Sequence, residues 1–301
     1  MTKQRSLLKP SIELLIAGLF WGFGFVATVW SLPFLSPAAI VTYRFLTAFL
    51  VGLLLFPFLN WKKISIKNEL KYSLLAGLSL GLCLFLQTWG LETTSATNSA
   101  FITTLYVVLV PFIARVFLAE KLHFLHWACI VVALIGTALI IQVGQLEFRI
   151  GDLLTLLCAL VASIQIVYVG WVGHRSQSSF VMNTLQNFWA GAPYLLFLFG
   201  PLGKWNLRTL DQKAWVGMMM LTFGSTVIDF YLQLKAQKEM PPSLASLFFL
   251  LESPFSCVFA VIFLGETINL SQSAGALLIL VACLFAVLAE KKRREVIPRL
   301  A

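Results

Sequence analysis

Two stretches that lie 146 residues apart decide how this chain is organised. LQTWGLETTSATNSAFITTLYVVLVPFIARVFLAE (86–120) aligns without a gap on LQLKAQKEMPPSLASLFFLLESPFSCVFAVIFLGE (232–266). Seven of the 35 positions are identical, including the opening Leu-Gln pair and the closing FLxE. The match of these landmarks, in the same order and at one spacing, predicts a chain built from two internal repeats.

The composition predicts that lipid, and not water, surrounds these stretches. Of the 301 residues, 59% are hydrophobic and 12% are charged, and the mean hydropathy is +0.88, whereas soluble domains carry about 25% charged residues. The net charge of +9 comes from residues between the apolar runs, which argues against nucleic acid as a partner. The runs are continuous and do not alternate as membrane strands do, so we predict an all-α integral membrane protein.

Ten apolar runs approach or reach the ~20 residues that a membrane helix needs. They span residues 12–31, 37–57, 71–91, 97–118, 124–142, 151–172, 178–200, 214–234, 243–264 and 271–289. Five runs per repeat is an odd number, so the second repeat must cross the membrane in the opposite sense to the first. We therefore predict ten transmembrane helices as two inverted five-helix repeats, 10–142 and 151–289, followed by a basic tail, 290–301.

The distribution of lysine and arginine predicts the orientation. Of the 22 such residues, seventeen fall on the side of the membrane that holds both termini, four fall on the other side, and Arg44 lies within the second run. Positive charge concentrates in cytoplasmic loops, so we predict cytoplasmic termini. The membrane is the inner membrane in a bacterium, which we favour, or another membrane in a eukaryote, because the tails carry no address that decides. The loop at 201–213 departs from this bias. The basic tail can also contact anionic membrane lipids.

A series of motifs along residues 10–290 resembles a known family. The motifs are Trp21-Gly22 in LFWGFGFVA, Pro37 and Arg44 in SPAAIVTYRF, and the two FLxE stretches, the second followed by Gly275. In this the chain resembles the drug/metabolite transporter superfamily, in the group with two EamA domains. The resemblance implies transport of a small metabolite, with the first, third and fourth helices of each repeat around a central cavity. SIQ (163–165) stands where a second Trp-Gly is expected, so the substrate contacts need not be symmetric.

The stretch FLLESPFS (248–255) places a carboxylate, Glu252, two residues before Pro254 in the ninth run. At 1.5 Å per residue, Glu252 lies roughly 13 Å from the cytoplasmic end of its helix, near the middle of a core ~30 Å thick. A charge at this depth costs ~2.5–3.5 kcal/mol on insertion scales, and Pro254 leaves the carbonyl of Leu250 without its helical partner. We therefore expect Glu252 to line a substrate cavity. The alternative is a buried acid that only shapes its helix.

The shift of 146 residues extends the candidate site from Glu252. It pairs Tyr106 with Glu252 and Gln87 with Gln233, and a twofold axis in the membrane plane brings each pair to a similar depth. We expect Tyr106 either to join Glu252 at the cavity or to serve as an aromatic packing residue. Asp229 is a candidate proton or cation site, or the partner of a nearby hydroxyl. The two amides line the path or hydrogen-bond between helices.

Trp21 and Arg44 carry further functional groups within the membrane. Trp21 lies at mid-helix, where its ring can wall a pocket and its N–H can donate. Arg44 can extend its long side chain outward to the membrane surface, neutralise Glu252 or bind a substrate carboxylate, and we favour a structural role. Lower-ranked lining candidates are Asn98, Gln165 and Tyr168.

The sequence has no Walker loop and no GxSxG, HExxH or CxxC motif. We therefore predict a protein that is not an enzyme and needs no cofactor, metal or catalytic residue. The five cysteines fall inside apolar runs at wide spacing, which predicts small core residues and not a disulfide or metal site. The alternatives are an intramembrane enzyme acting on lipid or peptide, for which only Asp229 and Glu252 approach a paired set, and a membrane scaffold without transport.

Taken with the repeat, these features predict a secondary-active transporter, an exporter or exchanger that works by alternating access. Two acidic side chains and at most one basic one near the midplane favour a small metabolite with an amine, such as an amino acid. A proton gradient is the candidate energy source, because no ATP-binding motif is present. The expected assembly is a monomer or a homodimer.

Overall fold

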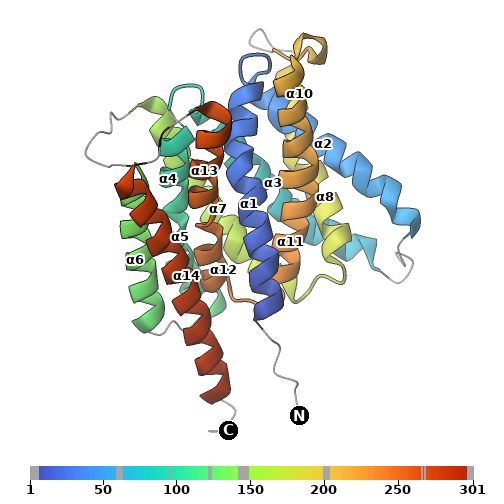
Figure 1. The fold of residues 1–301 in the computed structure, drawn as a ribbon. Helices are drawn as coiled ribbons and strands as arrows, with labels where there is room; N and C mark the ends of the chain where they lie inside the picture. Colours follow the sequence, from blue (N-terminus) through green and yellow to red (C-terminus); the bar gives the residue numbers. More distant parts are fainter. Residues whose placement is uncertain are drawn as a thin grey trace.

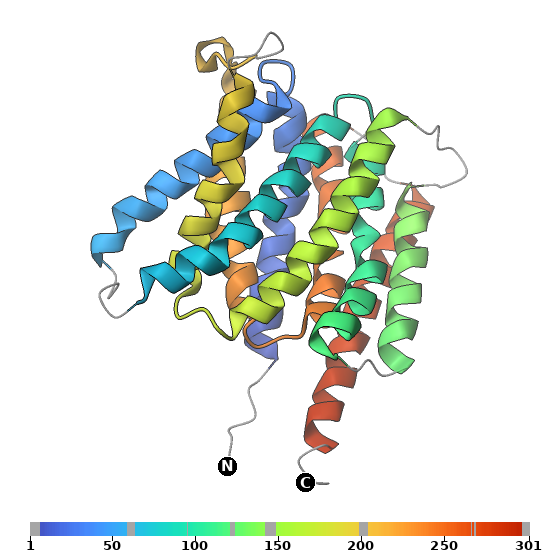
Figure 2. The same ribbon diagram turned by 180° about the vertical axis from the view of Figure 1, so that it is seen from behind.

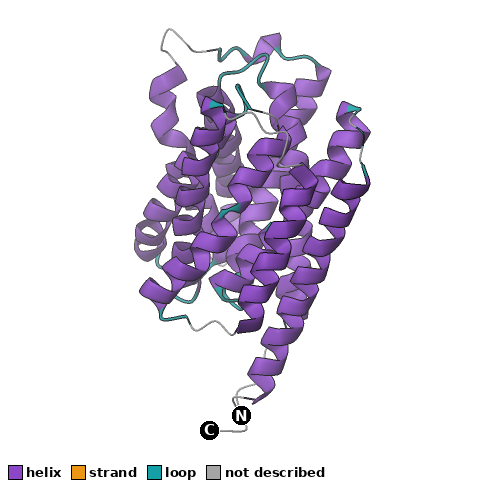
Figure 3. Cartoon of the chain, turned by 90° about the vertical axis from the view of Figure 1, so that its left-hand side faces the viewer, coloured by secondary structure: helices purple, strands orange, loops and turns teal. Residues whose placement is uncertain are grey.

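The computed structural model describes residues 7–58, 64–94, 96–120, 124–141, 149–198, 204–265, 267 and 269–296, in which every regular element is helical (Figure 3). The elements of the first repeat are α1 (Leu8–Ser31), α2 (Pro37–Leu55), η1 (Phe56–Phe58), α3 (Ile66–Gly90), α4 (Ala96–Thr104), α5 (Tyr106–Leu118) and α6 (Phe124–Ile141). Those of the second are α7 (Ile150–Gly173), α8 (Ser179–Gly191), η4 (Ala192–Tyr194), α9 (Leu195–Leu198), η5 (Leu207–Thr209), α10 (Gln212–Met219), η6 (Met220–Ile228), α11 (Asp229–Ala236), α12 (Pro242–Phe249), α13 (Glu252–Leu264) and α14 (Leu270–Val296).

Each predicted apolar run corresponds to one helical segment, although several segments are interrupted. Within the described ranges, seven segments are long and apolar enough to cross a membrane, and shorter apolar helices lie at Ile102–Leu118 and Phe124–Leu139. The remaining run is α8, which continues through η4, where Pro193 sits, into α9. The eighth run contains a π-helical segment, η6, between α10 and α11. The last helix, α14, continues to Val296 and so includes the start of the basic tail.

The fourth helical segments of the two repeats break and end at matched positions. The Leu105 N–H bonds to the Ile102 carbonyl at 3.2 Å, and 146 residues later the Leu251 N–H bonds to the Phe248 carbonyl at 3.0 Å. The segments then end in left-handed residues, Ala119 and Gly265, which are again 146 positions apart. Only the second repeat has a proline close after its break. The break therefore belongs to the repeat and does not depend on Pro254. The Leu250 carbonyl, which was expected to lack its helical partner because of Pro254, accepts from the Ser253 N–H at 3.1 Å.

The two repeats run in opposite directions. In Figure 1 both termini lie at the bottom of the bundle, and α1 begins there, whereas α7 begins at the opposite end (Figures 1 and 2). We call the end with the two termini the terminal end and the opposite one the far end. The packing follows the same inverted symmetry, because α3 packs on α7 and α8 while the eighth segment packs on α1 and α2. In Figure 2 the cyan α3 and the yellow-green α7 run side by side.

The inner helices form two sets, and the inverted symmetry of the repeats relates one set to the other. Helix set A consists of α3, α4, α5 and α7, and helix set B consists of α1, α10, η6, α11, α12 and α13. Packing is more extensive within each set than between them. The other helices lie outside, with α2 against α8 and α6 against α14, and Figure 1 shows α6 and α14 together at one edge.

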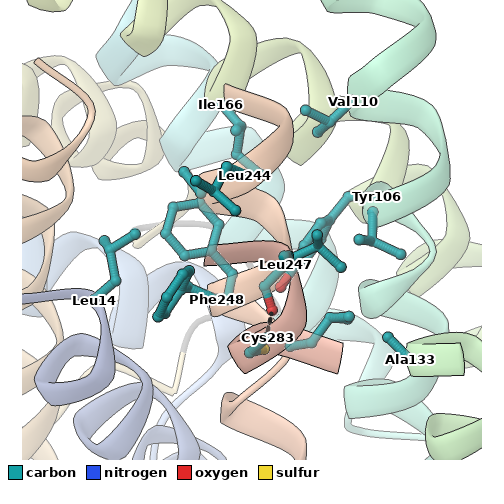
Figure 4. Close-up of a cluster of buried hydrophobic side chains, with 14 of the residues drawn as sticks. Leu14, Tyr106, Val110, Ala133, Ile166, Leu244, Leu247, Phe248 and Cys283 are labelled. Atoms are coloured by element: carbon teal, nitrogen blue, oxygen red, sulfur yellow. Dashed lines mark hydrogen bonds between the residues drawn. The ribbon is translucent and has the colours of Figure 1, made fainter. Parts of the chain in front are cut away.

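Close helix packing explains the Trp21-Gly22 motif. A Cβ atom on Gly22 would lie 2.6 Å from Phe255 Cβ and 2.8 Å from the Ser256 backbone nitrogen, so only glycine lets α1 approach α13 this closely. In lipid, where apolar burial gives helices little reason to associate, such van der Waals contact is a main source of stability. Figure 4 shows the largest buried cluster, in which Tyr106 lies near Leu247 and Phe248 of α12.

Candidate functional site

A cavity of about 100 Å³ lies between helix sets A and B. Seven of the ten predicted site residues line it, namely Trp21, Arg44, Gln87, Tyr106, Gln165, Gln233 and Glu252. On α1 the lining runs from Trp21 to Thr28, and on α3 it runs from Leu80 to Gln87. Both stretches lie in the half of the helix nearer the far end. The lining residues of α7, Ala162 to Ile166, lie in the half nearer the terminal end, and those of the eighth segment, Leu221 to Gln233, extend from its middle toward that end, so the cavity lies near the middle of the bundle.

Glu252 and Tyr106 meet at the lining of this cavity. They are the first residues of α13 and α5, and the Tyr106 Oη donates a hydrogen bond of 3.4 Å to Glu252 Oε1. Both are buried, at 8% and 3% exposed. Glu252 also sits at a helix N-terminus, where free backbone N–H groups and the helix dipole favour a carboxylate. The arrangement can hold a proton or the cationic group of a ligand.

Aromatic rings form the apolar part of the cavity wall. The ring of Trp21 meets Phe249 edge to face at a centroid distance of 5.1 Å and lies 5.8 Å from Phe230. Phe249 in turn lies 6.4 Å from the ring of Tyr106. These rings join α1, α5, α11 and α12 around one surface, which suits the hydrocarbon part of a small ligand.

Arg44 reaches inward from α2 instead of extending to the membrane surface. Its Nε donates to Thr226 Oγ1 at 2.9 Å, its Nη2 donates to the Ser225 carbonyl at 3.4 Å, and 4% of the residue is exposed. Both partners belong to η6, and the Thr226 hydroxyl donates to the Leu221 carbonyl at 2.7 Å. Isolated π-helical turns often occur at functional sites. Here the turn holds a guanidinium at the cavity lining.

Asp229 lies behind the cavity lining and not on it. It is the first residue of α11 and 0% exposed, and neither of its carboxylate oxygens has a hydrogen-bond partner among the residues that the structure describes. Its charged neighbour is Arg44. Asp229 was among the residues predicted from the sequence, whereas the amides of α8 were not; there the Asn183 side chain donates to the Val227 carbonyl at 3.1 Å. The signal was present in MNTLQN, because Asn183, Gln186 and Asn187 share one helix face.

The matched amides both line the cavity and bond between side chains. Gln87 Nε2 donates to Thr103 Oγ1 at 3.0 Å within set A. Gln233 Nε2 donates to Gln165 Oε1 at 3.2 Å and to Gln237 Oε1 at 3.1 Å, and Gln237 Nε2 donates to the Ile166 carbonyl at 2.9 Å. This amide chain joins set B to set A on the side of the cavity that faces the terminal end.

Two predicted residues are not brought to the cavity. Tyr168 on α7 is half-buried and directs its hydroxyl to the Tyr72 carbonyl at 3.1 Å. Asn98 lies in α4, but its side chain lies outside what the structure describes.

A second polar cluster lies at the terminal end. Glu69, 0% exposed, accepts from Ser176 Oγ at 2.9 Å and from the Gln177 N–H at 2.6 Å. Lys238, in the connection between α11 and α12, donates to the Ser176 carbonyl at 3.0 Å. Burial lowers the pKa of Lys238, and the nearby Glu69 opposes that decrease. We call Glu69, Ser176, Gln177 and Lys238, which join the two helix sets, the terminal seal.

The shift of 146 residues relates the terminal seal to the far end. It pairs Lys238 with Glu92, which follows α3 at the opposite face. Burial raises the pKa of Glu92, and Lys204 opposes that rise. Lys204 belongs to the loop that departs from the positive-inside bias. Glu92, whose charge is opposite to that of its matched residue Lys238, thus gives Lys204 a local partner.

The cysteine residues are mostly buried, as predicted, yet two of them meet. Cys83 Sγ and Cys158 Sγ lie 3.2 Å apart, and Cys83 lines the cavity. Their separation along the chain gave no sign of this contact, which depends on how α3 and α7 are rotated against each other.

Comparisons with known proteins agree with this architecture. Residues 9–142 and 149–288 each match the model of the EamA-like transporter family. A protein named "Uncharacterized transporter" from Archaeoglobus fulgidus is 29% identical over 287 residues, which cover 93% of this chain and 86% of that protein. A protein named "Uncharacterized transporter YyaM" from Bacillus subtilis is 26% identical over 296 residues, which cover 91% of this chain and 92% of that protein. A solved crystal structure superposes with a TM-score of 0.74 at 18% identity, covering 94% of this chain and 98% of the other.

Proposed function

The chain belongs to the EamA-like transporter family, and on that premise we propose that it is a secondary-active transporter of a small amine-bearing metabolite, such as an amino acid. The observation that carries the proposal is the cavity between the two helix sets, with Glu252 of the second repeat and Tyr106 of the first on its lining. Substrate sites of transporters with inverted repeats lie at such a repeat interface, near the bilayer midplane.

The size and charges of the cavity support this substrate class. Since one water needs ~10–15 Å³ of such space, a cavity of about 100 Å³ holds roughly seven to ten waters, which suits a small metabolite. Glu252 is the acceptor for an amine, Arg44 supplies a cation for a carboxylate, and the rings of Trp21 and Phe249 face an apolar portion. A polyanion such as a sugar phosphate would bring its charge close to Glu252.

Alternating access follows from the two helix sets. The amide chain and the terminal seal join the sets on the side of the cavity that faces the terminal end. The two sets rock about their contact in this proposal, so that the seal opens as the far end closes. Glu92 and Lys204 then supply the closing contact at the far end, in the place that symmetry gives to Lys238.

The direction of transport depends on the orientation of the bundle. Seventeen basic residues on the terminal side and four at the far end support cytoplasmic termini by the positive-inside rule. The conformation with a closed terminal end then faces outward, in the inner membrane of a bacterium. Export or exchange of the metabolite, coupled to protons at Glu252, is the proposed activity.

The test is a substrate screen with purified protein. Amino acids, simple amines and sugar phosphates are compared by thermal shift and then by flux into proteoliposomes. Stabilisation and flux with amine-bearing compounds, reduced in Glu252→Ala, are expected. Tight binding and flux of a sugar phosphate would contradict the substrate class, and binding without flux would contradict transport. Tyr168→Phe is the matched control, because it removes a hydroxyl away from the cavity.

A further inference from the structure

Two thiol groups meet at the wall of the cavity. Cys83 Sγ on α3 and Cys158 Sγ on α7 lie 3.2 Å apart, and the two residues are 7% and 0% exposed. A disulfide holds its sulfur atoms about 2.05 Å apart, so the two atoms need to approach by only about 1 Å. The helices come from different repeats, which means that the pair exists only in the folded arrangement of both.

The pair is within reach of molecules that enter the cavity. Cys83 is on the lining, and Cys158 lies directly behind it, hydrogen-bonded to Cys83 and to Thr103, which also lines the cavity. Cys129 on α6 and Cys283 on α14 are also buried, and these two helices pack against each other. Neither of them lines the cavity, and Cys283 donates to the Leu247 carbonyl at 3.1 Å (Figure 4).

We propose that Cys83 and Cys158 form an oxidation site, a dithiol that a small oxidant of the peroxide class converts into a disulfide from within the cavity. The inference goes beyond the transport activity, since it needs the cavity and the two sulfur atoms but no particular substrate. Reactivity of a thiol depends on access as well as on its chemistry. Cys83 lines the cavity with Cys158 directly behind it, whereas Cys129 and Cys283 do not line it.

The chemistry proceeds in two displacements. The sulfur of Cys83 attacks one oxygen of hydrogen peroxide, the O–O bond breaks, and one water leaves while Cys83 becomes a sulfenic acid. The sulfur of Cys158 then attacks the Cys83 sulfur, the S–O bond breaks, and the S–S bond forms as a second water leaves. Overall the two thiols lose two electrons and two protons, and the peroxide takes up both to become two waters.

The disulfide has a specific structural consequence. Both α3 and α7 belong to helix set A, so the bond joins helices within one set and does not tie set A to set B. It braces one wall of the cavity and removes the Cys83 thiol from the lining. Oxidation should therefore raise the thermal stability of the protein, while leaving the contacts of the terminal seal as they are.

The experiment uses reduced, purified full-length protein treated with hydrogen peroxide. Remaining thiols are blocked with N-ethylmaleimide after unfolding, and peptides are mapped by mass spectrometry. A Cys83–Cys158 disulfide is expected in the wild type and in Cys129→Ser, with Cys283 recovered in its alkylated form in the wild type. Neither Cys83→Ser nor Cys158→Ser should form a cross-link, and neither should gain thermal stability on oxidation.

Two results would overturn the proposal. One is recovery of Cys83 and Cys158 as alkylated thiols under conditions that oxidise Cys129, Cys257 or Cys283. The other is a Cys83–Cys158 link that forms only after unfolding. Phenylarsine oxide, which bridges close dithiols, gives an independent readout on the unmodified chain. One equivalent should bind to the wild type and to Cys129→Ser and be blocked by prior peroxide treatment, and failure to bind the folded wild type would contradict the proposed geometry.

Discussion

Tyr106 Oη lies 3.4 Å from Glu252 Oε1, and the two residues occupy the same position of their respective repeats, 146 residues apart. Each begins the second half of a broken helix, α5 or α13, in its own repeat. A twofold axis that relates the repeats brings matched residues together only close to the axis itself. The hydrogen bond therefore marks the centre of the inverted pair, at the wall of the cavity.

Removal of the Tyr106 hydroxyl tests the role of this contact. A net hydrogen bond contributes about 0.5–1.5 kcal/mol, so we expect Tyr106→Phe to weaken binding of an amine-bearing substrate by roughly two- to tenfold. Folding should be retained, because the ring still packs against Phe249. Binding is measured by thermal shift across substrate concentrations. Tyr168→Phe should bind as the wild type does, and equal affinity of all three proteins would remove the hydroxyl from the site.

Glycine at position 22 is expected to be needed for stability. Valine at this position would force α1 away from Phe255 and Ser256, which a Cβ would approach to 2.6 and 2.8 Å. Such overpacking costs about 1–3 kcal/mol, so Gly22→Val should melt well below the wild type in detergent. Gly173→Ala is the control, since the nearest atom to its added Cβ lies at 3.4 Å. Equal melting of Gly22→Val and the wild type would show that α1 and α13 do not cross this closely.

Arg44 and Asp229 should be coupled in stability. Each is buried, Asp229 has no hydrogen-bond partner within the described part of the chain, and each is the other's charged neighbour. Removing one charge leaves the other unbalanced in the membrane, a change that costs up to several kcal/mol. We expect Arg44→Met and Asp229→Asn each to lower the melting temperature, and the double variant to lose clearly less than the sum. Additive losses in this double-mutant cycle would show independent sites.

The terminal seal should open as pH rises. Burial lowers the pKa of Lys238, so this amine loses its proton at a lower pH than an exposed lysine does. Loss of the charge removes its attraction to Glu69 and weakens the bond to Ser176. Spin labels at positions 174 and 239, on the two loops of the terminal end, should report longer distances at alkaline pH. Lys238→Arg, which stays charged, should hold the short distance, and Lys238→Met should show the long one throughout. A pH response retained in Lys238→Arg would assign it to another group.

The fold was predictable because its determinants lie along the sequence itself. Apolar runs, the charge bias and the shift of 146 residues specify ten segments in two inverted repeats, and the shift also placed Tyr106 opposite Glu252. The features that could not be predicted from the sequence depend on how the helices are rotated against each other. The inward reach of Arg44, the contact between Cys83 and Cys158, and the π-helical η6 arise from packing between helices. Periodicity along one helix does not record these relations.

Glu252 carries the central claim, and its variants separate a functional from a structural acid. Glu252→Gln keeps the shape of the side chain but cannot exchange a proton, and Glu252→Ala removes the contact with a substrate amine. We therefore expect Glu252→Gln to fold and to retain substrate counterflow while losing accumulation driven by a pH gradient. Glu252→Ala should lose substrate binding as well.

The deciding measurement is flux of an amine-bearing substrate found in the screen, in proteoliposomes with and without an imposed pH gradient. Wild type, Glu252→Gln and Glu252→Ala are compared at equal protein amounts. The account predicts that the gradient stimulates flux only in the wild type. Gradient-driven flux in Glu252→Gln equal to that of the wild type would contradict it and leave Glu252 as a buried acid that shapes α13.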